Sequence, residues 1–73
     1  MNKNQINPDK LLLSKWTSRT PQQKEKHFIV TELFRDENDQ ILECLLEAVI
    51  NKNQYRVVWQ ELANIEQWQQ GWK

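Results

Sequence analysis

The 73-residue sequence contains only one cysteine, one glycine and two prolines, and none of its apolar runs is longer than three residues. A single cysteine, Cys44, excludes an internal disulfide and a CxxC metal site. The short apolar runs exclude a membrane-spanning helix and the hydrophobic region of a signal peptide. We therefore expect a cytoplasmic protein, since a reducing compartment does not favour disulfides.

The formal net charge is zero, but the charges are unevenly distributed along the chain. Residues 1–30 carry six Lys or Arg against two acids, whereas residues 31–66 carry three against eight. A basic segment can meet phosphate groups, yet a neutral total argues against a protein that binds nucleic acid mainly by counterion release. The plain alternative is that the basic half faces the acidic half on a mixed surface.

What is present indicates one small folded domain. Hydrophobic residues make up 38% of the chain and charged residues 27%, and there are four tryptophans. A chain this short buries only about 60% of its unfolded surface, and each aromatic side chain supplies roughly 150 to 250 Å² of burial. Residues 1–9 show no periodicity and end in the turn-forming Asn7-Pro8-Asp9. We predict a flexible N-terminal arm over 1–9 and a single small β-rich domain over 10–73.

Alternating apolar and β-branched residues predict strands along the chain. The segment LLLSKWTS (11–18) reads as a first strand, ended near Pro21, and KHFIVTELFR (26–35) reads as a second. The segment ILECLLEAVI (41–50) is ambiguous, because its apolar residues fit both a helix and a strand and its propensity favours helix.

Turn geometry decides in favour of a strand. A three-residue loop at Glu37–Asp39 pairs Phe34 with Leu42, Val30 with Leu46 and Phe28 with Ala48. A two-residue turn at Lys52-Asn53 then places Ile50 opposite Tyr55, Ala48 opposite Val57 and Leu46 opposite Trp59. Both registers select the same apolar face, which a one-residue slip would scatter. That face comprises Phe28, Val30, Phe34, Leu42, Cys44, Leu46, Ala48, Ile50, Tyr55, Val57 and Trp59, with Glu32 as its only charged member.

The predicted fold class is mainly β (α+β): an antiparallel four-stranded meander curled as a small half-barrel, with a short C-terminal helix. The helix is expected in QELANIEQWQQGWK, where Leu62, Ile65 and Trp68 share a side, Asn64 can cap, and Gly71 suits the position past the end. The second sheet face is half apolar and offers a patch of Ile29, Leu33, Leu45 and Val49.

The segments KLLLSKWTS, EKHFIVTEL, LEAV, WQEL and WQQGWK resemble a family of small Trp-rich bacterial proteins of unknown function, over nearly the whole chain. The resemblance implies no activity, ligand or catalytic residue. The family pattern usually has an acidic residue where this chain has Asn64, and both residue types cap helices.

The sequence offers little that could perform catalysis. In the predicted register His27 and Cys44 point to opposite faces, roughly 13 to 17 Å apart, so they form no catalytic dyad. Glu43 and Glu47 lie about 13 Å apart on a strand, too far for a glycosidase pair. Gly71 is the only glycine, which excludes a glycine-rich phosphate loop. We expect no enzyme, no cofactor and no metal site, with Cys44 a small buried hydrophobe.

Binding remains, with two alternatives. One is a protein-interaction or self-association module that uses the apolar patch. The other is a surface for single-stranded nucleic acid, because cations beside aromatic rings can contact phosphates and stack on bases. Trp59 and Trp68 are expected in the core. The candidate binding surface comprises Lys15, Trp16, Arg19, Lys24, Lys26, His27 and Trp72.

Overall fold

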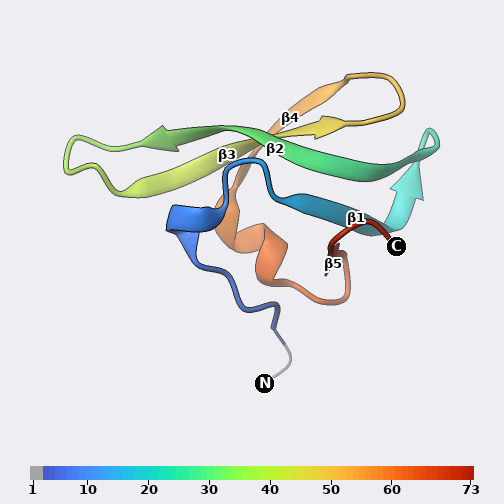
Figure 1. Ribbon diagram of the computed structural model, residues 1–73, viewed down its shortest axis with the longest axis horizontal. Helices are drawn as coiled ribbons and strands as arrows, with labels where there is room; N and C mark the ends of the chain where they lie inside the picture. The colour runs from blue at the N-terminus through green and yellow to red at the C-terminus, as the bar shows by residue number, and fades with distance from the viewer. Residues whose placement is uncertain (1–2) are drawn as a thin grey trace.

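Five antiparallel strands form one open sheet in the computed structural model, which describes residues 3–73 (Figure 1). The strands are β1 (Lys15–Gln22), β2 (Glu25–Arg35), β3 (Ile41–Ala48), β4 (Gln54–Val58) and β5 (Trp68–Gln70), in the spatial order β4-β3-β2-β1-β5. The prediction of a mainly β fold is confirmed, including strand rather than helix at 41–48, but there are five strands instead of four. Two short 3₁₀ helices complete the chain, η1 (Pro8–Lys10) and η2 (Trp59–Ala63). Within residues 3–73, no helix has the length and hydropathy that crossing a membrane requires.

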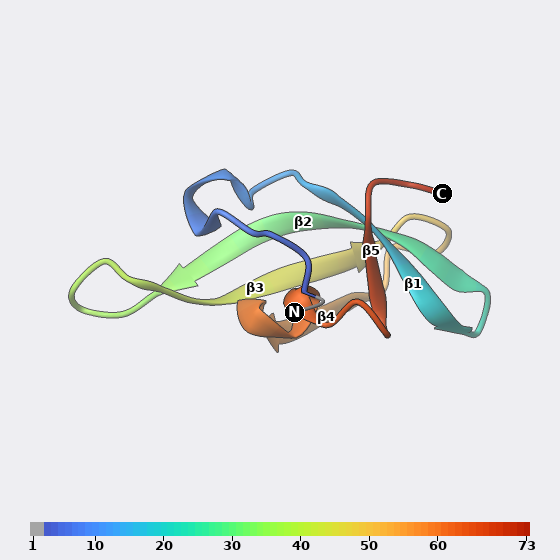
Figure 2. The ribbon, with the colours of Figure 1, turned by 90° about the horizontal axis from the view of Figure 1, so that it is seen from below.

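One face of the sheet is covered by other segments of the chain, and the other face is exposed. The inner face carries the buried side chains of Trp16, Phe28, Val30, Cys44, Leu46 and Ala48. The N-terminal segment and η2 lie below the sheet in Figure 1, and their Leu11 and Leu62 complete this core. The outer face carries Lys15, His27, Ile29, Leu45 and Val58, and Figure 2 shows β2 and β3 side by side along the length of the molecule.

The N-terminal segment contacts η2. Lys3 forms an isolated β-bridge with Asn64, and the Asn4 amide N–H donates to the carbonyl of Ala63 at 2.9 Å. The Asn4 side chain also donates to the carbonyls of Leu62 and Trp68. Of the predicted flexible arm, residues 1 and 2 lie outside the described residues, and its flexibility stays a prediction.

The predicted three-residue loop between β2 and β3 is confirmed. Asp36 N–H donates to the Gln40 carbonyl at 2.9 Å, which closes the loop over Glu37–Asp39. The Asp36 carboxylate accepts the backbone N–H groups of Asn38 and Gln40, and Asp39 adopts a φ of 64°. An aspartate that accepts from its own turn is the usual reason why this residue type begins such loops.

A β-bulge at Thr31 changes the predicted pairing over residues 32–34, and a second irregularity after Phe34 restores the predicted register with Arg35 opposite Ile41. Val30 faces Leu46 as predicted, but the next pair is Glu32 with Leu45, so Phe34 lies opposite Glu43 and not Leu42. One extra residue reverses the alternation of every side chain that follows it. Glu32 and Phe34 therefore move to the outer face, and Leu33 packs against the core. The bulge avoids burying the carboxylate of Glu32, which a regular strand would place in the core.

The turn between β3 and β4 is longer than predicted. The loop runs from Val49 to Asn53, Ala48 N–H donates to the Asn53 carbonyl at 2.8 Å, and Leu46 faces Tyr55 rather than Trp59. The predicted turn at Lys52-Asn53 is therefore wrong, and Ile50, at 62% exposure, lies in the loop rather than the core. The register differs by an even number of residues, so Tyr55 and Val57 still point to the predicted face.

The predicted C-terminal helix is wrong. In the C-terminal segment only η2 is helical, and the chain then forms β5, which pairs with β1. Asn64 takes an extended ψ of 105°, its side chain accepts the Glu66 N–H, and its carbonyl accepts those of Gln67 and Trp68. These local bonds end the helix after one turn. Gly71, with a φ of +81°, follows a strand and not a helix.

The first strand begins later than predicted, at Lys15 rather than at Leu11. It also ends later, at Gln22, because Pro21 lies inside β1 and does not end it. β5 pairs with Trp16–Ser18 only, so Pro21 lies beyond that pairing, where a missing N–H costs no ladder bond. The chain reverses at Gln23 and Lys24, whose φ angles of 55° and 65° define a two-residue turn. Such turns favour Asn-Gly, because both residues are left-handed.

Replacing Gln23→Asn together with Lys24→Gly should therefore raise the free energy of unfolding. We expect a gain of about 1 kcal/mol, because a side chain in the left-handed region costs roughly that much per residue. Urea unfolding followed by Trp fluorescence measures it. Asn38→Gly is the matched control, since this turn residue does not have a positive φ. A glycine there only increases the conformational freedom of the unfolded chain, so it should not stabilise the fold. An unchanged or lower midpoint for the double variant would contradict the turn assignment.

Candidate binding surfaces

Trp16, one of the two tryptophans predicted for the binding surface, lies in the core. It is 2% exposed, and its indole N–H donates to the Ser14 hydroxyl at 2.8 Å. It pairs with Phe28 in the register of β1 and β2, which places it on the inner face. Its ring is therefore not part of the exposed surface.

Three other predicted residues do come together on the outer face. The Lys15 ammonium nitrogen lies 5.0 Å from the centroid of the Trp72 ring, and the His27 ring centroid lies 6.1 Å from it. Trp72 remains 44% exposed and donates its indole N–H to the Phe28 carbonyl at 2.9 Å. We call Lys15, His27 and Trp72 the Trp72 cluster.

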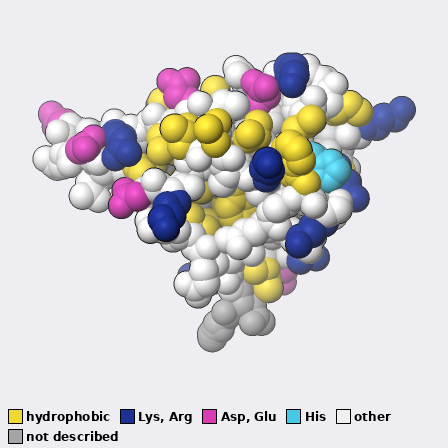
Figure 3. Space-filling view, viewed as in Figure 1, with side chains coloured by type: hydrophobic (Ala, Val, Ile, Leu, Met, Phe, Trp, Pro, Cys, Tyr) yellow, Lys and Arg dark blue, Asp and Glu magenta, His cyan; other side chains and the backbone are white. Residues whose placement is uncertain are grey.

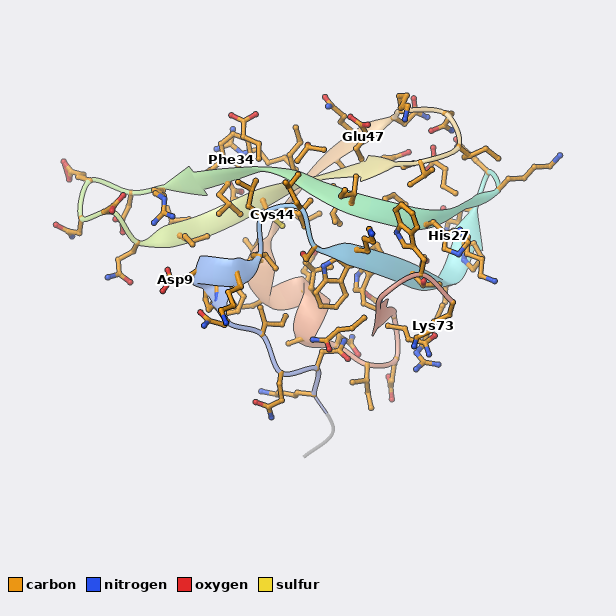
Figure 4. All side chains as sticks on the ribbon, in the orientation of Figure 1. Asp9, His27, Phe34, Cys44, Glu47 and Lys73 are labelled. Carbon is orange, nitrogen blue, oxygen red and sulfur yellow. The ribbon has the colours of Figure 1, made fainter. Side chains whose placement is uncertain are left out.

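The C-terminal residues hold this cluster in place. The Thr17 hydroxyl donates to the Gly71 carbonyl at 2.7 Å and accepts the Lys73 N–H at 2.9 Å. The Lys73 carbonyl lies 3.1 Å from His27 Nε2, and Figure 4 labels both residues at this end of the sheet. The tail therefore crosses β1 instead of projecting into solvent.

The remaining predicted cations are exposed along the β1–β2 hairpin. Arg19 lies in β1, Lys24 lies in the turn, and Lys26 lies near the start of β2. Within residues 3–73, Lys15 is the only one of the predicted cations placed over the Trp72 ring.

An apolar patch crosses the outer face. We call it the outer patch, and it comprises Ile29, Phe34, Leu45, Val49 and Val58. Leu33, which the sequence placed here, belongs to the core because of the bulge at Thr31. Figure 3 shows hydrophobic side chains in a row over β2 and β3, with acidic and basic groups along the upper margin and basic groups below.

Charged side chains are anchored beside this patch. The Arg56 guanidinium carbon lies 3.8 Å from the Phe34 ring centroid, and its Nε donates to Glu43 at 2.7 Å. Lys52 approaches Glu47 at 4.0 Å. The outer patch is therefore flanked on one side by the ion pairs of Glu43 and Glu47 and on the other by Lys15 of β1 and His27 of β2.

Sequence reasoning missed Glu25, a 6% exposed carboxylate on the inner side of the sheet. Its Oε1 accepts the Tyr55 hydroxyl at 2.6 Å, and its Oε2 accepts the side-chain amides of Asn51 and Asn53 at 2.7 and 2.8 Å. It thereby ties the β3–β4 loop and β4 to the start of β2. A lone acid between two lysines in the basic half of the chain was the available signal.

These hydrogen bonds determine the protonation state of the Glu25 carboxyl group. The Tyr55 hydroxyl, followed by Asn51 and Asn53, holds the pKa of the Glu25 carboxyl below its ordinary value, because donors stabilise the charged form. The same bond raises the pKa of Tyr55, since its phenol is held as the donor. Glu25 is therefore ionised at neutral pH.

Cys44 is the buried hydrophobe that the sequence predicts. It is fully buried on the inner face, and burial raises the pKa of its thiol to about 11. His27 lies on the outer face, so the two side chains are separated by the sheet as expected. Within residues 3–73, no three His, Cys, Asp or Glu side chains gather in a way that could hold a metal ion.

The fold and these surfaces define a class: a small antiparallel β-sheet domain, rich in tryptophan, with one filled face and one exposed apolar face. The family model described as Tryptophan-rich protein (DUF2389) matches residues 14–73. The chain therefore belongs to this family of unknown function, as the resemblance of its motifs predicts. No curated protein and no solved structure matches the chain.

The Glu25 network predicts a pH-dependent stability. A carboxyl whose pKa is lower in the folded than in the unfolded chain stabilises the fold above its ordinary pKa, and this contribution is lost as pH falls through the folded pKa. Glu25→Gln should therefore lower the urea midpoint at pH 7, and its difference from wild type should shrink on acidification below about 4.5, the ordinary value.

Glu66→Gln, an exposed acid, is the matched control and should follow wild type throughout. Urea titrations from neutral to acidic pH measure both variants. A difference between Glu25→Gln and wild type that is independent of pH would show that the network stabilises by shape and not by charge.

Proposed function

We propose that this protein is a non-catalytic interaction module and that its outer face pairs with the outer face of a second copy. The observation that carries the proposal is the outer patch, where Val49 and Val58 are 37% and 46% exposed. Exposed contiguous apolar surface with a polar margin is the usual mark of an interaction site.

Charge complementarity favours a second copy as the partner. Lys15 of β1 and His27 of β2 lie on one side of the face. Glu43 and Glu47 of β3 lie on the other side, where each also has a cation of its own copy, Arg56 or Lys52. A two-fold axis that lies between the two faces, parallel to the strands, brings Lys15 of one copy toward the carboxylates of β3 in the other. The formal net charge of zero means that two copies do not repel each other at long range.

The shape of the molecule is also suitable. Its principal-axis extents are 37 × 31 × 15 Å, so the domain is a thin slab with one wide uncovered face. A face of this size can supply the roughly 800 Å² per partner that a standard interface buries. Pairing two such faces would give each sheet the second apolar layer that one copy lacks.

Leu45→Glu should weaken this pairing at least tenfold without unfolding the domain. Leu45 lies at the centre of the outer patch opposite Arg56, which a glutamate can face across the strands. In sedimentation velocity over a concentration series, we expect wild type to form dimers and the variant to need at least tenfold higher concentration, equivalent to about 1.4 kcal/mol.

The matched control is Leu12→Glu, because Leu12 is 48% exposed and lies outside the outer patch. It should dimerise as wild type does. A wild-type chain that stays monomeric at every concentration, or equal weakening by both variants, would contradict pairing through this face.

A second candidate function is single-stranded nucleic-acid binding, and the Trp72 cluster is the observation that favours it. An exposed ring with Lys15 at 5.0 Å combines a stacking platform with a cation for phosphate. Because Trp16 is buried, Trp72 is the one exposed ring of the two tryptophans that the sequence predicted for the binding surface.

This alternative predicts that mixed-sequence single-stranded RNA or DNA quenches Trp fluorescence and that the affinity falls with salt. Trp72→Ala should cost about 1 to 3 kcal/mol of binding, the usual worth of one stacked base. The matched control is Lys10→Gln, a lysine of η1 outside the cluster. If low-salt titrations show no quenching, this alternative is wrong.

A further inference from the structure

A hollow of about 380 Å³ opens on the inner side of the sheet, between the β1–β2 hairpin and β4. Figures 1 and 2 both place the β1–β2 hairpin, β5 and the β3–β4 loop toward the same end of the molecule. The hollow lies on the opposite side of the sheet from the outer patch, so nothing about it depends on pairing through that patch. It is lined by Phe28, Leu46, Tyr55, Val57 and Trp68, by Glu25, and by polar residues of the hairpin that include Ser18, Thr20 and Gln22.

Aromatic rings form a large part of this lining. Phe28 packs edge-on against Trp68 at a centroid distance of 5.3 Å and an interplanar angle of 81°. It also packs against Tyr55 at 6.2 Å and 66°. Rings held nearly at right angles present both faces and edges to the space between them. A ring face attracts a positive charge through its quadrupole.

Glu25 adds an unneutralised negative charge to the same hollow. It is 94% buried, as its 6% exposure shows, and its three hydrogen-bond donors are all neutral groups. In the part of the chain that the structure describes, no Lys, Arg or His nitrogen lies within 4.0 Å of its carboxylate. Buried carboxylates are almost never left without a cation. A carboxylate has about four acceptor positions, so three donors leave capacity for one more.

We infer that this hollow binds an organic cation, an ammonium or guanidinium group on a short aliphatic chain. Glu25 would neutralise the charge, and Trp68 and Tyr55 would contact the cationic head and its methylene groups. An anion would be repelled by Glu25, and a purely apolar ligand would bury the carboxylate without a cation. The volume lies at the lower end of the range of small-molecule sites, which suits a ligand of this size.

The same chemistry is offered by a free amine and by a Lys or Arg side chain of a partner segment. The test therefore uses three probes: n-butylammonium, methylguanidinium, and a tripeptide with a central lysine and blocked ends. Binding is followed by the NMR shifts of the Trp68 indole N–H and of the Phe28 and Tyr55 amides. The neutral control ligand is n-butanol, which has the same chain without the charge.

We expect saturable shifts with the cations and at least tenfold weaker binding of n-butanol. Tighter binding of the tripeptide than of n-butylammonium would identify a partner side chain as the source, and the reverse order would identify a free amine. Glu25→Gln should weaken the binding of the cations at least tenfold while leaving the affinity for n-butanol unchanged. The matched control is Glu32→Gln, on the outer face, which should leave all affinities unchanged.

The ligand comparison does not depend on a variant that folds, because it is made on the wild-type chain. No shift with any cation, or n-butanol binding as tightly as n-butylammonium, would overturn the inference. A monomeric wild-type protein that still binds the cations would leave this site standing while refuting the pairing of outer faces.

Discussion

The pairing of β2 with β3, and the bulge at Thr31 within it, is the constraint on which the rest of the structure depends. Before the bulge, Val30 faces Leu46 in the core, and after it Leu33 takes the inner side while Glu32 points outward. The bulge has an energetic cost, because it coincides with a Thr31 hydroxyl that is buried without a hydrogen-bond partner. Leaving one hydroxyl unsatisfied costs less than burying the charge of Glu32.

Once this register exists, the two faces acquire different characters. The inner face is closed by Leu11 and Leu62, which come from opposite ends of the chain and make up for the small size of the domain. The bulge turns Phe34 outward under Arg56 and Leu33 inward, so it replaces one apolar side chain of the outer face by another. The closure is incomplete at one end, where the hollow beside Glu25 remains.

Glu25 and the tail show how distant segments complete local structure. Glu25 is bonded by Asn51, Asn53 and Tyr55, and these bonds accompany a β3–β4 loop longer than a two-residue turn. At the other end, Thr17 holds Gly71 and Lys73 across β1, which positions Trp72 over Lys15. Each candidate site is therefore assembled from residues far apart in the sequence.

The sequence by itself determined the mainly β class, strands within 26–35 and 41–50, the loop at Glu37–Asp39, the burial of Cys44 and the family. These follow from alternation and turn chemistry, which act over a few residues. Only the tertiary structure decided the bulge at Thr31, the fifth strand in place of a helix, the burial of Trp16 and the network of Glu25. These depend on which distant segment packs against a residue, and the free energy of that packing does not appear in any local pattern.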